Sequence, residues 1–154
     1  MGDLSPHFDA SEFACGCGCG FGTRPGDVQP GLLEHLEAMR TLLGRGLVIG
    51  HDGGCRCETQ NKIAGGVPNS AHTHGGAADV ESIGGLARYE LIVAAVVAAI
   101  EKTHNIPGLD FAAVCQEVRN TLRGLGIGRN FVHVETDERS TAPRPAVWGY
   151  EVKE

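Results

Sequence analysis

Residues 69–81 read NSAHTHGGAADVE, which sets two histidines and an acid among small residues. His72 and Asp79 lie seven positions apart, and the residues between them are small enough to fold tightly. The last five residues, 77–81, predict a short strand that carries Asp79. Neutral imidazoles and carboxylates are both common zinc ligands. The stretch therefore predicts two ligands of a zinc site.

A third ligand has to come from elsewhere, and the segment FVHVE at residues 131–135 can supply it. Its alternation predicts a strand in which His133 and Glu135 share one face while two valines occupy the other. A histidine followed two residues later by an acid offers a metal ligand and a nearby general base. A lone strand histidine is more often a core residue, but its combination with the 69–81 motif favours the ligand role for His133.

The rest of the chain predicts an α+β fold, with about three helices packed against a small antiparallel sheet. The three helices are predicted over residues 30–43, 86–103 and 110–126. Asp110 is the predicted cap of the third helix. Short strands are predicted over residues 46–50, 77–81, 131–135 and 146–152. The glycine-rich stretch 51–76 predicts a long structured loop.

Composition limits the classes of function. With 154 residues, 42% of them hydrophobic and 21% charged, we expect one soluble, monomeric domain over residues 1–154, beginning with an irregular Cys/Gly-rich segment at 1–29. A net charge of -6 and no basic stripe argue against nucleic-acid binding. The apolar run 91–100 is half as long as a membrane span. No signal-peptide pattern opens the sequence, so synthesis in the cytoplasm is expected.

Five of the six cysteines fall into two tight groups, which consist of Cys15, Cys17, Cys19 and of Cys55, Cys57. We expect the two groups to meet in space and to fix Arg56, which lies between the last two. Three states stay open, in decreasing order of expectation: a second, structural zinc, disulfides, and free thiols. The sixth, Cys115, is predicted to pack in the core.

SAHTHGGAAD at 70–79 fits the pattern S-x-H-x-x-G-x-A-x-D and resembles the M15 zinc peptidases. These are the D-Ala-D-Ala carboxypeptidases and L-alanyl-D-glutamate endopeptidases, which share their fold with the amino-terminal domain of Hedgehog. Other segments resemble the phage-associated branch in the same order: HFDASEFAC, GGCRCETQN followed by AGG, GIGRNFVHVE, and RPAVWGY. The resemblance covers nearly the whole chain. It implies a Hedgehog/DD-peptidase-like fold and a peptidoglycan peptide as the substrate.

The resemblance also implies roles for individual residues. It makes His72, Asp79 and His133 the ligands of one catalytic zinc. It places Arg56 on the wall of the active site, where its guanidinium would hold a carboxylate or carbonyl of the substrate.

Ser70 and His74 are further candidates for substrate binding. A turn role for Ser70 and an outer position for His74 are the alternatives.

Three departures from the family pattern bear on catalysis. GHDGGCRC replaces the usual S-G-Y-R, Asn130 stands where other branches carry an acid, and Glu135 stands where an aspartate is usual. Glu135 is the predicted base, and Glu81 is the alternative because it shares a strand face with Asp79.

Two functions follow from these residues. The first is a zinc metallopeptidase that hydrolyses stem peptides or cross-bridges of the bacterial cell wall, in a host or a phage. The second is a phage or prophage structural or cell-wall-binding protein that keeps the zinc without turnover, which the altered surroundings of Arg56 and the residue Asn130 favour. The bond cleaved, and D,D- against L,D-specificity, stay open.

Overall fold

The computed structural model describes residues 2–81, 84, 87–101, 111–137, 139 and 146–150. Over these ranges the α-helices are α1 (Pro30–Leu43), α2 (Glu58–Ile63), α3 (Arg88–Glu101) and α4 (Phe111–Thr121). Two short 3-10 helices are η1 (Ala10–Phe13) and η2 (Ala71–His74). The strands are β1 (Ala77–Glu81), β2 (Gly124–Ile127), β3 (Phe131–Glu135) and β4 (Ala146–Gly149). The predicted α+β class is confirmed.

The four strands form one sheet in the order β1-β3-β2-β4. β3 pairs antiparallel with both β1 and β2, but β2 and β4 are parallel. The sheet is therefore mixed, and the parallel β2–β4 pair departs from the predicted antiparallel arrangement. The reason lies in the topology: Gly124 faces both Glu135 and Ala146, so the chain enters β4 at the end of the sheet where it leaves β3. β4 then runs antiparallel to β3 and parallel to β2, which lies between them.

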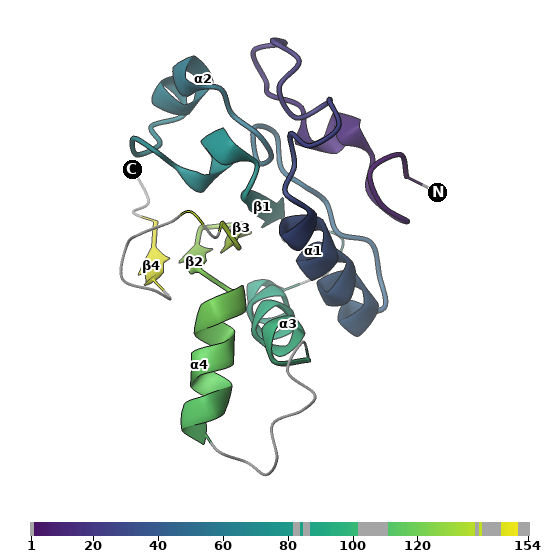
Figure 1. Cartoon of the computed structure of the whole chain (residues 1–154), viewed down its shortest axis with the longest axis vertical. Helices are drawn as coiled ribbons and strands as arrows, with labels where there is room; N and C mark the ends of the chain where they lie inside the picture. Colours follow the sequence, from purple (N-terminus) through teal and green to yellow (C-terminus); the bar gives the residue numbers. More distant parts are fainter. Residues whose placement is uncertain are drawn as a thin grey trace.

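The two faces of the sheet have different environments. Figure 1 shows α3 and α4 on one side of the sheet with α1 beside them, and α2, η2 and the amino-terminal loops on the other. Val80, Val132 and Val134 are fully buried in the core on the helical side, together with leucines of α1 and small residues of α3. Because side chains alternate along a strand, their neighbours Asp79 and His133 point to the opposite side.

Helices α1 and α3 form the main helical layer and pack against each other. Pro30 begins α1, and Gly44 ends it in the left-handed region with φ 64. α1 contributes buried Leu32, Leu36 and Met39. Four alanines of α3 are buried, which lets the two helices approach closely. Burial of each large apolar side chain stabilises the fold by roughly 1.5–3 kcal/mol.

Several predicted boundaries differ from the structure. Residues 46–50 form no strand, since only Ile49 makes an isolated bridge, with Val80. The loop predicted over 51–76 contains α2 and η2. The strand β2 was not predicted because alternating glycines in GLGI weaken any strand signal. Asp110, the predicted helix cap, lies outside the described residues, as do residues 86, 102–103 and 151–152 at the ends of predicted elements.

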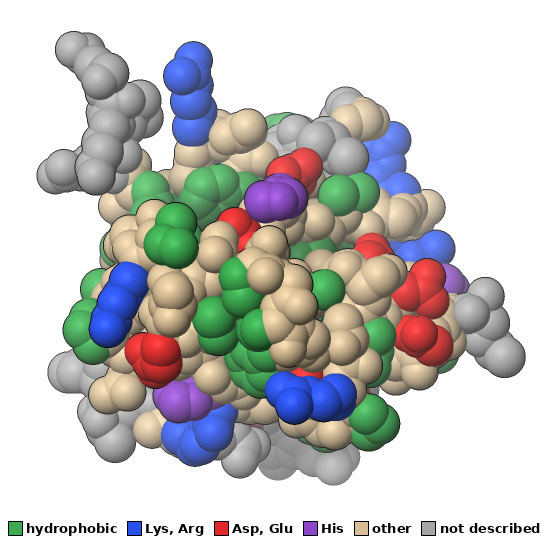
Figure 2. Space-filling model, turned by 90° about the horizontal axis from the view of Figure 1, so that it is seen from above, with side chains coloured by type: hydrophobic (Ala, Val, Ile, Leu, Met, Phe, Trp, Pro, Cys, Tyr) green, Lys and Arg blue, Asp and Glu red, His purple; other side chains and the backbone are tan. Residues whose placement is uncertain are grey.

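Acidic and basic side chains both appear on the face of the molecule shown in Figure 2. Figure 2 views the molecule from the side of α2 and the amino-terminal loops, and its Lys and Arg side chains are scattered around the rim. Among the described helices, none has the length and apolarity needed to cross a membrane.

Candidate metal centre

His72 lies in η2, a 3-10 turn that begins after Ser70 and ends at Gly75 in the left-handed region. Its side chain is buried, and Nδ1 lies 2.7 Å from the carbonyl oxygen of Gly54. Because a carbonyl only accepts a hydrogen bond, Nδ1 must carry the proton and donate it. The lone pair of His72 is then on Nε2, which faces the sheet.

Asp79 and His133 face each other on paired strands, with Asp79 of β1 opposite His133 of β3. Asp79 Oδ1 lies 2.8 Å from His133 Nδ1. His72 Nε2 lies 3.1 Å from the same nitrogen and 3.4 Å from Asp79 Oδ1. Nitrogen and oxygen ligands about 2.0–2.2 Å from a tetrahedral zinc lie roughly 3.3 Å from one another. The three side chains therefore fit one zinc ion, and the donor set is of the kind that zinc prefers.

Arg56 holds the other oxygen of Asp79. Arg56 Nη2 lies 2.6 Å from Asp79 Oδ2, and Arg56 Nε donates to the carbonyl oxygen of Asp52 at 2.5 Å. The arginine side chain is only 12% exposed. Its backbone N–H also donates to the carbonyl oxygen of His72, at 3.0 Å. Arg56 thus orients both Asp79 and the turn that carries His72.

Burial and the neighbouring charges shift the pKa values of all three residues in the cluster. Burial opposes ionisation of Asp79, but the interactions with His72 and His133 outweigh it and bring the pKa of Asp79 well below its usual range. Burial lowers the pKa of His72. Burial also acts to lower the pKa of His133, but the carboxylates of Asp79 and Glu135 outweigh it and raise that pKa. The carboxylate of Asp79 stays ionised, which is the form that binds a metal.

Glu135 lies on the same face of β3 as His133 and is 5% exposed. Its Oε2 is 3.7 Å from His133 Nε2, which is too long for a hydrogen bond. Glu81, the alternative base, is at the far end of β1, where its carboxylate packs against Gly50. Asn130 is exposed between β2 and β3. Of the two candidate bases, Glu135 is the one in contact with the cluster.

A family model described as Peptidase M15 matches residues 6–110. The chain belongs to the peptidase M15 family. No curated protein matches it. The family membership is consistent with a metallopeptidase that depends on zinc, and His72 with Asp79 lies inside the matched range. His133 lies beyond that range, so its part in the site rests on the geometry and on the FVHVE pattern rather than on the family match.

Ser70 and His74 occupy different positions in this M15 peptidase. Ser70 immediately precedes η2, and its carbonyl oxygen accepts hydrogen bonds from the backbone and the hydroxyl of Thr73. The His74 side chain is half-buried and outside the three-residue cluster, while its carbonyl oxygen accepts from Gln29 and Arg139. Both residues shape the turn around His72, and their predicted contact with substrate stays a prediction.

Two aromatic residues of this M15 peptidase were not among the predicted site residues. The Trp148 ring lies 5.2 Å from the ring of His133, and that of Tyr150 lies 6.5 Å from it, between centroids. Gly126, opposite His133 on β2, leaves the space that both rings occupy. The alternation of WGY predicts that Trp148 and Tyr150 share one face of a strand. Only the parallel pairing of β4 with β2 shows that this face lies beside His133.

The cysteines of this M15 peptidase divide in an unexpected way. Four cysteine sulfurs lie within 4.8 Å of one another, those of Cys15, Cys17, Cys19 and Cys57. Cys55, the predicted fifth member, does not join them, because its buried sulfur faces the carbonyl oxygen of Asp27 at 3.7 Å. Cys115 lies half-buried in α4 rather than in the core.

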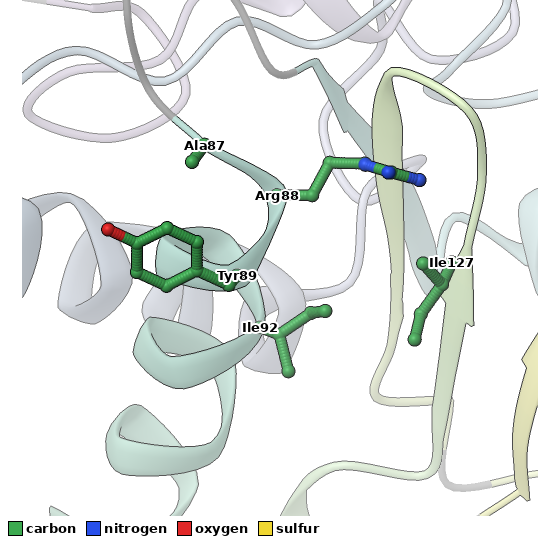
Figure 3. Close-up of a pocket in the computed structure, with 5 residues that line it drawn as sticks. All are labelled: Ala87, Arg88, Tyr89, Ile92 and Ile127. Atoms are coloured by element: carbon green, nitrogen blue, oxygen red, sulfur yellow. The ribbon is translucent and has the colours of Figure 1, made fainter.

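A separate cavity of about 380 Å³ is present at the start of α3. Figure 3 shows its lining residues, Ala87, Arg88, Tyr89, Ile92 and Ile127. Arg88 Nη1 donates to the carbonyl oxygen of Gly128. None of the five lining residues belongs to either cluster of metal-binding side chains, so this cavity is not the candidate metal centre.

Proposed function

We propose that this M15 peptidase hydrolyses peptide bonds of peptidoglycan stem peptides or cross-bridges with one catalytic zinc ion. The observation that carries the proposal is the convergence of His72 Nε2, Asp79 Oδ1 and His133 Nδ1 within hydrogen-bonding distance of one another. Family membership supports peptide hydrolysis. The peptidoglycan substrate is supported by the sequence motifs, which resemble those of cell-wall peptidases.

His72, Asp79 and His133 would hold the zinc, and three protein ligands would leave one position for water or substrate. When bound there, zinc would polarise the scissile carbonyl and lower the pKa of a water molecule. Arg56 keeps Asp79 in place by binding the oxygen that faces away from the histidines. The arginine is therefore a positioning residue in this proposal, in addition to its predicted role at the active-site wall.

Glu135 is proposed as the general base. It is buried on the same face of β3 as His133, and its Oε2 lies 3.7 Å from His133 Nε2, the ring nitrogen that is not part of the three-atom cluster. In this role Glu135 takes a proton from water and later gives it to the leaving amine. Its side chain is one methylene longer than the aspartate usual in the family, so its reach to a bound water differs.

Trp148 and Tyr150 are proposed to line the substrate side of the site. Both rings lie against His133, and Tyr150 is 41% exposed. Burial, followed by the charge of Asp79, raises the pKa of Tyr150 to about 12, so its hydroxyl stays protonated. A protonated phenol can donate a hydrogen bond to a peptide carbonyl.

A second function, a non-catalytic zinc-containing protein of a phage or prophage that binds the cell wall, is favoured by one observation. Arg56 is already engaged by Asp79 and by the Asp52 carbonyl, which leaves less of its guanidinium for a substrate. In this second function the zinc and its ligands would stabilise the fold without turnover.

One experiment separates the two functions. Purified protein loaded with zinc is incubated with peptidoglycan, and the soluble fragments are identified by mass spectrometry. New amino or carboxyl termini that disappear with a chelator and return with zinc support hydrolysis. Their absence, with zinc bound at a one-to-one ratio to the His/Asp site, would support the binding protein. The termini also identify the bond and its D,D- or L,D-character.

A further inference from the structure

Four cysteine sulfurs meet outside the His/Asp site. Cys15 Sγ lies 3.4 Å from Cys17 Sγ, and Cys17 Sγ lies 3.6 Å from Cys57 Sγ. Together with Cys19, all four sulfurs lie within 4.8 Å of one another. Four thiolates bound at about 2.3 Å around one zinc lie roughly 3.8 Å apart. The spacing of the four sulfurs is therefore close to that of a tetrahedral thiolate site.

The backbone of CGCGCG at residues 15–20 is curled so that three sulfurs converge. Gly18 and Gly20 have φ of 75 and 83, a region that other residues rarely adopt. The Cys15 N–H donates to the carbonyl oxygen of Phe21 at 2.8 Å and closes the loop. In an extended segment these side chains would point the same way but lie farther apart. The alternating glycines allow the loop to gather them at one point.

The fourth sulfur comes from a second loop that is docked on the first. The Cys57 N–H donates to Cys15 Sγ at 3.3 Å, and the Gln60 N–H donates to Cys57 Sγ at 3.4 Å. The Gly16 N–H donates to the Asp52 carboxylate at 3.0 Å. The two N–H groups that donate to sulfur, those of Cys57 and Gln60, stabilise the thiolate form. The two loops are thus held together at the point where the four sulfurs meet.

The surroundings of the sulfurs favour a bound cation over the other two states. Four ionised sulfurs at this spacing repel one another unless a cation lies between them. Arg56, next to Cys57 in the chain, turns its guanidinium toward Asp79 instead. A disulfide needs about 2.05 Å between its sulfurs, and Cys17 is near two partners of which it could bond only one. Cys17 and Cys19 are also exposed, where free thiols would be open to oxidation.

We propose that a structural Zn²⁺ binds four thiolates, those of Cys15, Cys17, Cys19 and Cys57. Each thiol that binds gives its proton to solvent, and no redox step is involved. The site fixes the loop that carries Arg56, and so it holds this arginine against Asp79. Metal binding by the thiols does not depend on the proposed peptidase activity; only the effect on Arg56 rests on that proposal.

The first test uses Co²⁺ as the probe, with reduced protein under anaerobic conditions. A His72→Ala variant weakens the His/Asp site, so that the thiol site can be titrated alone. We expect one equivalent of Co²⁺ to produce the charge-transfer absorption of thiolate-bound cobalt. Cys57→Ser in the same background should reduce this absorption and weaken the binding of Co²⁺, because one of four thiolates is lost, and Cys115→Ser, the matched control in α4, should change neither.

A second measurement avoids substitutions altogether. X-ray absorption of unsubstituted protein loaded with two equivalents of zinc should show a sulfur shell at about 2.3 Å in addition to nitrogen and oxygen. A shell of nitrogen and oxygen alone would overturn the proposal. So would a cobalt–thiolate absorption and a Co²⁺ affinity that Cys57→Ser leaves unchanged. A mass lower by two hydrogens for each disulfide bond, in anaerobically purified protein, would show that the cysteines form disulfides instead of binding a metal.

The effect on Arg56 has its own readout. Cys57→Ser in otherwise unsubstituted protein should weaken zinc affinity at the His/Asp site by roughly 10–100-fold, the usual consequence of losing a partner that orients a ligand. Trp148, the single tryptophan of the chain, lies against His133 and reports this binding by its fluorescence. Unchanged affinity would overturn the positioning role and leave the thiol site itself standing.

Discussion

The His/Asp cluster and the cysteine cluster are assembled in different ways. Asp79 and His133 are 54 positions apart and meet because two strands pair in one register, and His72 is placed by a turn beside them. Three of the four cysteines are near neighbours in one loop, and two of the four are exposed. The first cluster requires the completed sheet, whereas the second requires only that two loops dock. The buried position of the His/Asp cluster on the sheet suits a catalytic metal, and the position of the cysteine cluster between two loops suits a metal that holds these loops together.

We expect the largest effect from His133→Ala, which tests whether metal binding at the His/Asp cluster can be lost while the cysteine cluster is kept. It removes a ligand from the sheet without touching either cysteine loop. Zinc bound to the His/Asp site and the release of peptides from peptidoglycan should both be lost, while the cobalt–thiolate absorption should remain. Metal stoichiometry and fragment analysis measure the two outcomes, and Cys115→Ala is the control. Full activity in His133→Ala would place the catalytic metal elsewhere.

Glu135→Gln should affect only the chemical step. The amide keeps the size of the side chain but cannot take a proton, so hydrolysis should fall by roughly 10²–10⁴-fold. Zinc content at both clusters should stay unchanged, as measured by elemental analysis. Glu81→Gln is the matched control on β1 and should keep near-normal activity. If Glu81→Gln were the inactive variant, the base would have to be reassigned to Glu81.

Arg56→Lys should weaken metal binding at the His/Asp cluster without affecting metal binding at the cysteine cluster. A lysine ammonium cannot bind the Asp79 carboxylate and the Asp52 carbonyl in the planar geometry of a guanidinium. We expect roughly 10–100-fold weaker zinc affinity at the His/Asp site. Cobalt binding by the thiols should be unaffected. Equal weakening at both sites would mean that the arginine holds the loops rather than Asp79.

Gly126→Ala should have the smallest effect of the four. A Cβ at this position would lie 2.9 Å from the Trp148 ring and 2.6 Å from that of Tyr150, so both rings would have to move away from His133. We expect a loss of about 1–3 kcal/mol in the free energy of unfolding and an altered tryptophan emission.

Gly149→Ala is the control for this change, because a Cβ there meets no atom within 4 Å. Its free energy of unfolding should stay within about 0.5 kcal/mol of the unsubstituted protein. Equal destabilisation by both substitutions, in chemical denaturation, would show that the rings are not held by Gly126.

Periodic segments of the sequence predicted the helical layer and two strands well. α1, β1 and β3 have the predicted bounds because the alternation or helical spacing of their apolar residues matches their buried faces. β2 could not be found in this way, since two of its four residues are glycines that carry no pattern. The parallel pairing of β2 with β4 depends on the path of the chain between strands rather than on any local residue.

For the candidate site, the sequence predicted residue types but not their partners. The spacing in residues 70–79 singled out His72 and Asp79, and the alternation of FVHVE singled out His133. The contact of Arg56 with Asp79 depends on side-chain conformation across two separate loops, which no pattern specifies. In the same way, the sequence CRC could not tell that Cys57 faces the other sulfurs while Cys55 faces the interior.

The contact between Cys15 and Cys57 also bears on the unfolded state of the chain. It joins two positions 42 residues apart, and the whole of α1 lies between them. A metal held at both ends would restrict the unfolded chain and reduce the conformational entropy that folding removes. α1 carries no residue of either cluster, yet it supplies Leu32, Leu36 and Met39 to the core. The stability of α1 would then depend on zinc concentration, because zinc would close the segment between Cys15 and Cys57 that contains this helix.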